Sequence, residues 1–573
     1  MTGFRFWGLL IKIVGLSFIL TGCGSENNSG DVNATGNVAL INGKIYTVND
    51  KQSVEEAVVV KKGSIVFVGS TAEAQSRIDV DTLVIDLKGK LVLPGIHDSH
   101  LHPLEAGSEA ITCILDSSIS PAKQATKLKA CGEENTGLDW VLGWGYSLES
   151  LLAMKKDPRA FLDEMIPDRP VAIMEETSHS IWVNSKALAL AGISANTPHP
   201  KGGAILKHMA TGQPTGVLLD TAGEIIFDIA FAPNTVLEEM NYQGLLSGLE
   251  QVAKNGITSV VDARLYWKRN YLKAWDRAEK ENTLTARAVL SLWAYPLEGD
   301  TDQIEILKSM YRDDGNSLLR VTQIKMYSDG IIHNSTASLI EPYKEYFEEV
   351  GPLGLNYFDK TRMTKYVTEL EKAGFDMHIH AIGDRAVRES LDAIEDSMQV
   401  NGTLDSPRRH RLTHVEMVDS NDFGRFAELG VIADFQVAGE FTLPKNSSWV
   451  EGQIGDRHKD MLPVRTIYDT GALVTLSSDW DVSSLSPFVG MQNSLQRGEQ
   501  SLPNIDAVIR AYTINAAILM RQEDKTGSIE VGKLGDLIVL DQDIVTVEID
   551  SIAKTNVLLT LLEGKAVFSS PML

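Results

Sequence analysis

Eight short runs rich in β-branched residues constrain the fold of this chain more than any other feature of its sequence. Several of them are separated by stretches with helical periodicity, such as 362–374 and 384–398. Strands that alternate with helices are typical of a parallel α/β sheet, and eight is the number of strands that closes a (β/α)8 TIM barrel. The predicted barrel strands are 91–100, 257–263, 286–295, 321–330, 375–384, 411–418, 431–437 and 473–479.

Short strands at both ends of the chain lie outside this alternation. Residues 38–48 and 55–70, and then 527–541 and 556–568, alternate apolar and polar residues around glycine turns. This pattern predicts a small antiparallel sandwich that is assembled from both termini. The predicted domains are a β-sandwich of residues 37–90 and 525–573, and a barrel of residues 91–524.

The segment from about 106 to 235 does not follow the barrel pattern, and we expect it to be an insertion that covers the mouth of the barrel. It contains Cys113 and Cys131. Two thiols can pair in an oxidising compartment, but only if their Cβ atoms approach closely, which spacing does not show. The sequence therefore leaves this pairing open.

The first 22 residues have the pattern of a secretory leader, with two basic residues around a short apolar stretch. The leader ends in LTGC (20–23), which resembles the bacterial lipobox, where the cysteine is lipidated and becomes the mature N-terminus. An ordinary leader with a chance cysteine is the alternative. Residues 23–36 are polar and predict a flexible tether. We therefore expect a protein of the bacterial cell envelope, on the outer membrane or the periplasmic face, that meets the membrane only through a lipid on Cys23.

The chain is acidic, with a formal net charge of −24. Nucleic-acid binding needs clustered Lys and Arg against phosphates, so this balance argues against a nucleic-acid partner. Oligomer formation is left open by the composition.

Histidines gather at the C-terminal ends of the predicted strands, which is where barrel active sites are built. His100 and His102 are two residues apart and point to the same face of their strand. His380 ends the fifth strand, His414 the sixth and Asp479 the eighth. Each residue alone is more often a buried polar group of the core than a ligand. Together, at the same end of four strands, they predict a metal site.

Imidazole and carboxylate groups are the ligands that zinc favours, and a catalytic site keeps one position open for water. We therefore expect one or two divalent ions, with zinc as the default. Hydroxide formed on such ions at neutral pH can attack a polarised carbonyl. Asp479 is expected to act as general base and then as general acid, passing the proton to the departing nitrogen of a small-molecule substrate.

Several motifs resemble those of a known family. The run LPGIHDSHLHP resembles the first-strand signature of the amidohydrolase superfamily. HSIWVNSKAL (179–188), KMYSDG (325–330), HAIGDRA (380–386) and SSDWDVSS (477–484) resemble its amidohydrolase-3 branch, which includes the N-substituted formamide deformylases. The resemblance covers roughly residues 38–568. It implies a metal-dependent hydrolase of a non-peptide carbon–nitrogen bond.

The resemblance also implies a ligand on the fourth strand. Lys325 lies where members of the family carry a lysine that can be carboxylated to bridge two metal ions. The alternative is an ordinary lysine that contacts the substrate or an acidic neighbour, because members with one metal exist. The sequence departs from the family at Val437, Thr413 and Trp480, where relatives often have Pro, Glu and a small residue. None of these changes removes a predicted metal ligand, but they put the choice of substrate in doubt.

Other residues near these motifs have less specific signals. His179 and Trp144 are candidates for substrate binding. Asp384 is expected to be the N-cap of the next helix. His97 should point to the opposite face of its strand, and His378 should lie deeper than His380, where it could hydrogen-bond to a ligand.

Two further functions stay open on the sequence alone. A mononuclear deaminase of the same fold would need a glutamate as general acid and no bridging lysine, so Lys325 argues against it. A non-catalytic envelope lipoprotein that binds metal or solute is the other alternative, and Asp479 argues against that one because turnover needs an acid beside the open metal position.

Overall fold

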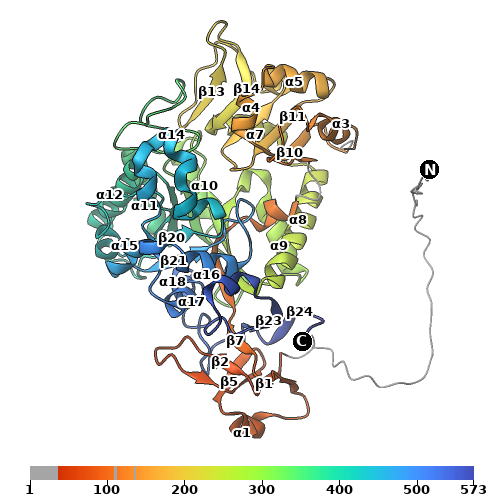
Figure 1. Ribbon diagram of the computed structural model, residues 1–573, viewed down its shortest axis with the longest axis vertical. Helices are drawn as coiled ribbons and strands as arrows, with labels where there is room; N and C mark the ends of the chain where they lie inside the picture. Colours follow the sequence, from red (N-terminus) through yellow and green to blue (C-terminus); the bar gives the residue numbers. More distant parts are fainter. Residues whose placement is uncertain (1–35, 109–112, 135–136) are drawn as a thin grey trace, which may run out of the picture.

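A nearly closed barrel of eight parallel strands forms the centre of the molecule (Figure 1). The computed structural model describes residues 36–108, 113–134 and 137–573. The predicted leader, Cys23 and all but the last residue of the predicted tether lie outside these described residues. In barrel order the strands are β8 (Ile96–Leu101), β15 (Ile257–Leu265), β16 (Arg287–Trp293), β17 (Leu319–Tyr327), β18 (Asp376–Ala381), β19 (Arg411–His414), β20 (Ile432–Gln436) and β21 (Val474–Ser477).

The first and last barrel strands meet at the C-terminal mouth. The backbone N–H of Asp479 donates to the carbonyl of His100 at 2.8 Å, and the N–H of His102 donates to the carbonyl of Trp480 at 2.7 Å. Apart from a half-buried His414, every residue of the eight strands is buried. The barrel fold predicted from the sequence is therefore confirmed.

One predicted strand is in fact two, and others, such as 411–418, are shorter than predicted. The run 91–100 is two strands, because β7 (Leu91–Pro94) belongs to the sandwich and only β8 belongs to the barrel. Gly95 separates them and lies against Thr258, whose Oγ1 would be 2.1 Å from a Cβ at this position. A residue with a side chain would not fit here. Because the apolar run continues across Gly95, the boundary between the sandwich and the barrel could not be predicted from the sequence.

Helices cover the outside of the barrel between successive strands. The longest is α8 (Thr235–Lys254), which leads the chain back from the insertion into β15. Within the described ranges, no helix combines the length and apolarity that crossing a membrane would require. Other helices around the barrel are α9 (Tyr271–Lys280), α10 (Asp300–Ser309), α11 (Lys360–Glu371), α12 (Asp384–Asn401), α13 (Arg425–Leu429), α15 (Val464–Asp469), α16 (Pro487–Leu495), α17 (Ile505–Ala511) and α18 (Ile514–Leu519).

The sandwich is built from both termini, as predicted, and lies at the end of the barrel opposite the insertion (Figure 1). C-terminal strand β22 (Leu537–Leu540) pairs antiparallel with β7, which joins the two ends of the chain in one sheet. One sheet has the order β5-β4-β1-β6 and the other β24-β23-β22-β7-β2-β3. The remaining bounds are β1 (Val38–Ile41), β2 (Lys44–Tyr46), β3 (Val54–Glu55), β4 (Ala57–Lys61), β5 (Ser64–Gly69), β6 (Leu83–Asp86), β23 (Val557–Leu562) and β24 (Lys565–Ser569).

The insertion folds around a six-stranded sheet of its own, in the order β13-β14-β12-β11-β10-β9, above the barrel mouth (Figure 1). Its main helices pack on this sheet through separate apolar clusters on the two faces. The bounds are β9 (Cys113–Ile114), β10 (Val141–Tyr146), β11 (Val171–Glu175), β12 (Ser180–Val183), β13 (Gly203–Lys207), β14 (Pro214–Asp220), α3 (Ala125–Glu134), α5 (Pro158–Met165), α6 (Ser185–Leu190) and α7 (Thr221–Ala230).

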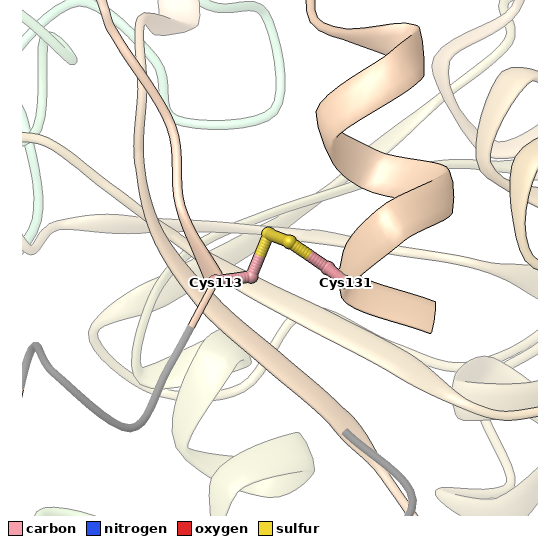
Figure 2. The surroundings of a disulfide bond; sticks show 2 residues. All are labelled: Cys113 and Cys131. Atoms are coloured by element: carbon pink, nitrogen blue, oxygen red, sulfur yellow. A yellow bond between two sulfur atoms is a disulfide. The ribbon is translucent and has the colours of Figure 1, made fainter. Parts of the chain in front are cut away.

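A disulfide joins the edge strand of this sheet to a helix (Figure 2). Cys113 begins β9 and Cys131 lies in α3, and their Cα atoms are 5.6 Å apart. The pairing that the sequence left open is therefore formed. It closes a loop that includes the residues between β9 and α3.

Candidate active site

Three histidines surround one carboxylate at the mouth of the barrel. Nε2 of His100 is 3.3 Å and Nε2 of His102 is 3.2 Å from Oδ1 of Asp479. Nδ1 of His414 is 3.9 Å from Oδ2 of the same residue. Ligand atoms of His100, His414 and Asp479 all lie within 4.8 Å of one another. The ends of β8, β19 and β21 thus bring four of the predicted site residues together.

The backbone at two of these strand ends is strained. His414 and the following Val415 have φ angles of 73° and 50°, and Asp479 has a φ angle of 53°. Residues other than glycine rarely adopt this left-handed region, and such strain is concentrated at functional sites. It turns the chain sharply where the side chains of His414 and Asp479 face the barrel axis.

His380, at the end of β18, borders the same group. Its ring centroid is 4.5 Å from that of His414, and it stacks on Tyr327 at 4.1 Å. Nε2 of His380 lies 3.1 Å from the carbonyl oxygen of Gly330. Its Nδ1 is buried and has no hydrogen-bond partner among the described residues. The structure therefore places His380 at the edge of the cluster with one unpaired nitrogen.

Lys325 on β17 is fully buried inside the barrel. Its Nζ lies 3.4 Å from Nε2 of His378, and no carboxylate of the described residues forms a salt bridge with it. Burial lowers the pKa of Lys325 well below its usual value, although the charge of Asp479 acts in the opposite direction. No carboxylate of the described residues thus pairs directly with Lys325, and Asp479 and Asp434 act on it only from beyond salt-bridge distance. A neutral amine is the form that reacts with carbon dioxide.

Burial also sets the charge state of the other groups. It lowers the pKa of His100, His380 and His414 well below the usual value, which favours neutral imidazoles that can bind a metal. Burial alone would raise the pKa of Asp479, but His100 and His102 lower it well below its ordinary range. The cluster therefore combines neutral nitrogen donors with an ionised carboxylate.

Polar groups deeper in the barrel orient these side chains. Nδ1 of His100 lies 2.9 Å from Oγ1 of Thr413 and 3.0 Å from Nε2 of His378. The amide of Gln436 donates to the same Thr413 hydroxyl at 2.9 Å. Thr413, which departs from the family pattern, thus still supports His100. Sequence reasoning missed Thr413 and Gln436 in this role, and their only signal was a polar side chain on a predicted barrel strand.

The insertion contributes His179 to the site. Its ring centroid is 5.3 Å from that of His380, and its Nδ1 lies 2.7 Å from Oδ1 of Asp220. His179 also lines a cavity of about 80 Å³ with His380, His414 and Asp479. This cavity has an apolar wall and holds Glu416, whose pKa burial raises to about 7. Sequence reasoning did not single out Glu416. The apolar wall is formed by Ile331, Ile332, Ile382, Phe441, Trp449, Leu462 and Val482.

Trp144 lies in a different cavity, of about 100 Å³, between the insertion and the barrel. His179 lines the cavity that contains the histidine cluster. Trp144 does not line that cavity. The structure therefore separates the two predicted substrate-binding residues. Glu105 and Arg264, which line the cavity of Trp144, were not predicted from the sequence.

The remaining sequence-based predictions have mixed outcomes. His97 points away from the cluster, and its ring nitrogens contact the carbonyl of Gly95 at 3.0 Å and Oγ1 of Thr526 at 2.8 Å. Asp384 is the first helical residue of α12, whose N-cap is Gly383, so the predicted cap is one residue off. Asp329 of the KMYSDG motif accepts backbone hydrogen bonds from Ser338, Ile382 and Gly383, and so ties together the loops after β17 and β18.

The donor set fits a divalent metal ion. Nδ1 of His102 and Nδ1 of His380 are buried without a hydrogen-bond partner among the described residues, which is costly unless a ligand satisfies them. Neutral imidazoles and an ionised carboxylate are the donors that zinc and similar ions prefer. The cluster opens onto the cavity of about 80 Å³, which leaves room for a substrate.

Comparisons with known proteins agree with this geometry. The model of the amidohydrolase family matches residues 83–568. The Bacillus subtilis protein YtcJ is 29% identical over 92% of this chain and 98% of its own length. The N-substituted formamide deformylase of Arthrobacter pascens is 27% identical over 92% of this chain and 97% of its own.

Solved structures share the fold. An uncharacterised metal-dependent hydrolase of Pyrococcus furiosus has a TM-score of 0.69 at 23% identity and covers 88% of this chain and 99% of its own. The zinc complex of the atrazine chlorohydrolase TrzN from Arthrobacter aurescens has a TM-score of 0.51 at 14% identity, over 93% and 95% of the two chains. At these identities the likeness extends to the fold alone.

Proposed function

Because this chain belongs to the amidohydrolase family and is a hydrolase of carbon–nitrogen bonds other than peptide bonds, we propose that it cleaves an amide-type bond of a small molecule with the help of a divalent metal ion. The observation that carries the proposal is the convergence of His100, His102 and His414 on Asp479 at the barrel mouth. Residues from three strands meet there around one carboxylate.

In this proposal His100, His102, His380, His414 and Asp479 would hold the metal, and Lys325 in its carboxylated form would supply a further oxygen ligand. A divalent ion in such a site lowers the pKa of a coordinated water and polarises the carbonyl of the substrate. Zinc is the ion that we propose, because the donor set is rich in imidazole.

The residues of this chain then supply the proton transfers. Asp479 takes a proton from the attacking water and passes it to the nitrogen that departs, which matters because an amide anion is a poor leaving group. Thr413 and His378 fix the orientation of His100 through contacts of 2.9 and 3.0 Å. The insertion covers the mouth and limits access of bulk water.

Removal of the metal tests this proposal. Chelation should abolish hydrolysis of a panel of N-substituted formamides and other small amides, and added zinc should restore it, with about one or two ions bound per chain. Products are identified by mass spectrometry, since release of ammonia from a ring amino group would indicate a deaminase instead. Metal binding without turnover of any compound would favour a binding protein, and hydrolysis that survives complete chelation would exclude the proposal.

We also propose that the protein is attached to the bacterial cell envelope through a lipid on Cys23. The lipobox-like sequence LTGC supports this, and so does the Cys113–Cys131 disulfide, because disulfides persist in oxidising compartments. Labelled palmitate should be incorporated into the full-length chain and should be lost in Cys23→Ala. Equal labelling of the variant would rule out Cys23 as the anchor.

A further inference from the structure

A buried arginine faces two adjoining cavities beside the histidine cluster. Arg269 ends the 3-10 helix η3 (Trp267–Arg269) and is 5% exposed. It lines the cavity that contains Trp144 and a neighbouring one that contains His179 and Tyr327. Since both of the latter rings pack against His380, the arginine lies on a path that leads to the cluster. The residues that line both cavities are Met174, Ser178, Phe227, Arg264 and Arg269.

The charge of Arg269 is not paired in the described part of the chain. No salt bridge involves it there, and its Nε is buried without a partner. The groups that act on it are the hydroxyl of Tyr271 and, from a greater distance, the charge of Glu105. Arg264 is different, because its Nε and one terminal nitrogen donate to Glu105 at 3.1 and 3.0 Å. Arg264 is thus paired directly with a carboxylate, whereas Arg269 has no carboxylate within salt-bridge distance among the described residues.

Aromatic rings hold the guanidinium in place. Its central carbon lies 3.6 Å from the ring centroid of Tyr266, 5.1 Å from that of Phe231 and 5.3 Å from that of Phe227. Such contacts attract a cation, but they do not satisfy its hydrogen-bond donors. A buried guanidinium whose donors are not all paired is costly unless a ligand supplies acceptors.

Another acid near Arg269 does not fill this role. Glu224 lines the cavity of His179 and accepts a hydrogen bond from Trp293 Nε1 at 3.1 Å. Burial raises the pKa of Glu224 to about 8, although Arg269 acts in the opposite direction. At neutral pH this carboxyl is largely protonated, so it leaves the charge of Arg269 mostly uncompensated.

We propose that Arg269 binds a carboxylate on the substrate, so that the preferred substrate is an amide-type small molecule with an apolar body and an anionic group. This inference rests on the proposed function for the identity of the scissile bond. The planar guanidinium fork matches a carboxylate in a bidentate geometry. Trp144, Phe227 and Phe231 supply the apolar wall beside it.

Binding can be tested without turnover. Two probes of similar shape, 3-phenylpropionate and 3-phenylpropan-1-ol, are titrated into the metal-loaded protein by calorimetry, and then into the chelated protein. We expect a preference for the carboxylate of about 10-fold or more, because hydrogen bonds to charged groups contribute that much. The preference should persist after chelation, which separates binding at Arg269 from binding at the metal, and it should vanish in Arg269→Gln.

Two further variants sharpen the result. Arg269→Lys keeps the positive charge but lacks the planar guanidinium group, so this variant should lose part of the preference for the carboxylate probe. Arg277→Gln is the matched control, because Arg277 also stacks on a tyrosine, at 3.7 Å from the ring centroid of Tyr242, but is exposed and paired with Glu239 and Glu281. It should bind as the unaltered protein does.

Three outcomes would overturn this inference. They are a folded Arg269→Gln that keeps its carboxylate preference, an unaltered protein that shows no preference or binds neither probe, and a preference that disappears with the metal. None of them bears on metal-dependent amide hydrolysis. Conversely, loss of that activity would leave the binding result standing, so failure of the two proposals can be told apart.

Discussion

Asp479→Asn is expected to lower kcat by about 10²- to 10⁴-fold, the range that a positioned general acid–base contributes. Asparagine keeps the size of the side chain and one oxygen that can contact His100 and His102. In the unaltered protein Oδ1 of Asp479 is 3.3 and 3.2 Å from Nε2 of these two histidines. It cannot accept the proton of the attacking water or deliver one to the leaving nitrogen. The measurement is kcat for any amide that the unaltered enzyme hydrolyses, together with metal content by elemental analysis.

Asp456→Asn is the control for this prediction. Asp456 is an exposed acid that pairs with Lys459 at 2.6 Å and lines neither the cavity of Trp144 nor the one that contains His380 and His414. We expect its effect on kcat to be at least tenfold smaller than that of Asp479→Asn. If Asp479→Asn retained its metal and more than a tenth of the activity, Asp479 would not be the proton-transfer group. Loss of metal together with activity would show that its main contribution is as a ligand.

The barrel and much of the candidate site could be predicted from the sequence because both depend on regular strands. His100 lies on β8 and His102 follows its last residue, while His380, His414 and Asp479 lie at or just beyond the ends of strands that were recognised from their β-branched runs. In a parallel barrel all such ends meet at one mouth, so position along each strand is enough to place them together. No knowledge of the loops is needed for that step.

The residues that were missed lie where this regularity ends. Arg269 lies in a short 3-10 helix after β15, and its place beside Phe227 of the insertion depends on how two domains pack. Spacing in the sequence gives no information about that packing. Gly95 was missed for another reason, since the apolar residues on both sides of it read as one strand although they belong to two sheets. Trp144 was assigned to substrate binding by its residue type alone, and the structure places it in the cavity of Arg269 rather than in the one that His179 shares with His380 and His414.

Lys325 is the residue for which the structure most sharpens the expectation from the family resemblance. Its side chain is buried inside the barrel, its amine contacts His378 at 3.4 Å, and burial lowers its pKa well below the ordinary value. A neutral amine can combine with carbon dioxide to form a carbamate, which offers two oxygens to adjacent cations. An ordinary cationic lysine at this depth would instead need a carboxylate partner, and none of the described residues provides one.

Lys325→Met should therefore reduce the bound metal from about two ions per chain to about one and lower kcat by about 10²-fold or more. Methionine has a similar length and is apolar, so it fills the buried position without an unpaired charge. Lys325→Arg is the matched variant, since it keeps a nitrogen-based cation but cannot form a carbamate, and it should fail in the same way. In the unaltered protein, growth with ¹³C-bicarbonate should give a carbamate carbon signal by NMR that both variants lack. Two metal ions in Lys325→Met, or no carbamate signal in the fully metal-loaded protein, would show that Lys325 is not a bridging ligand and would favour a site with a single ion.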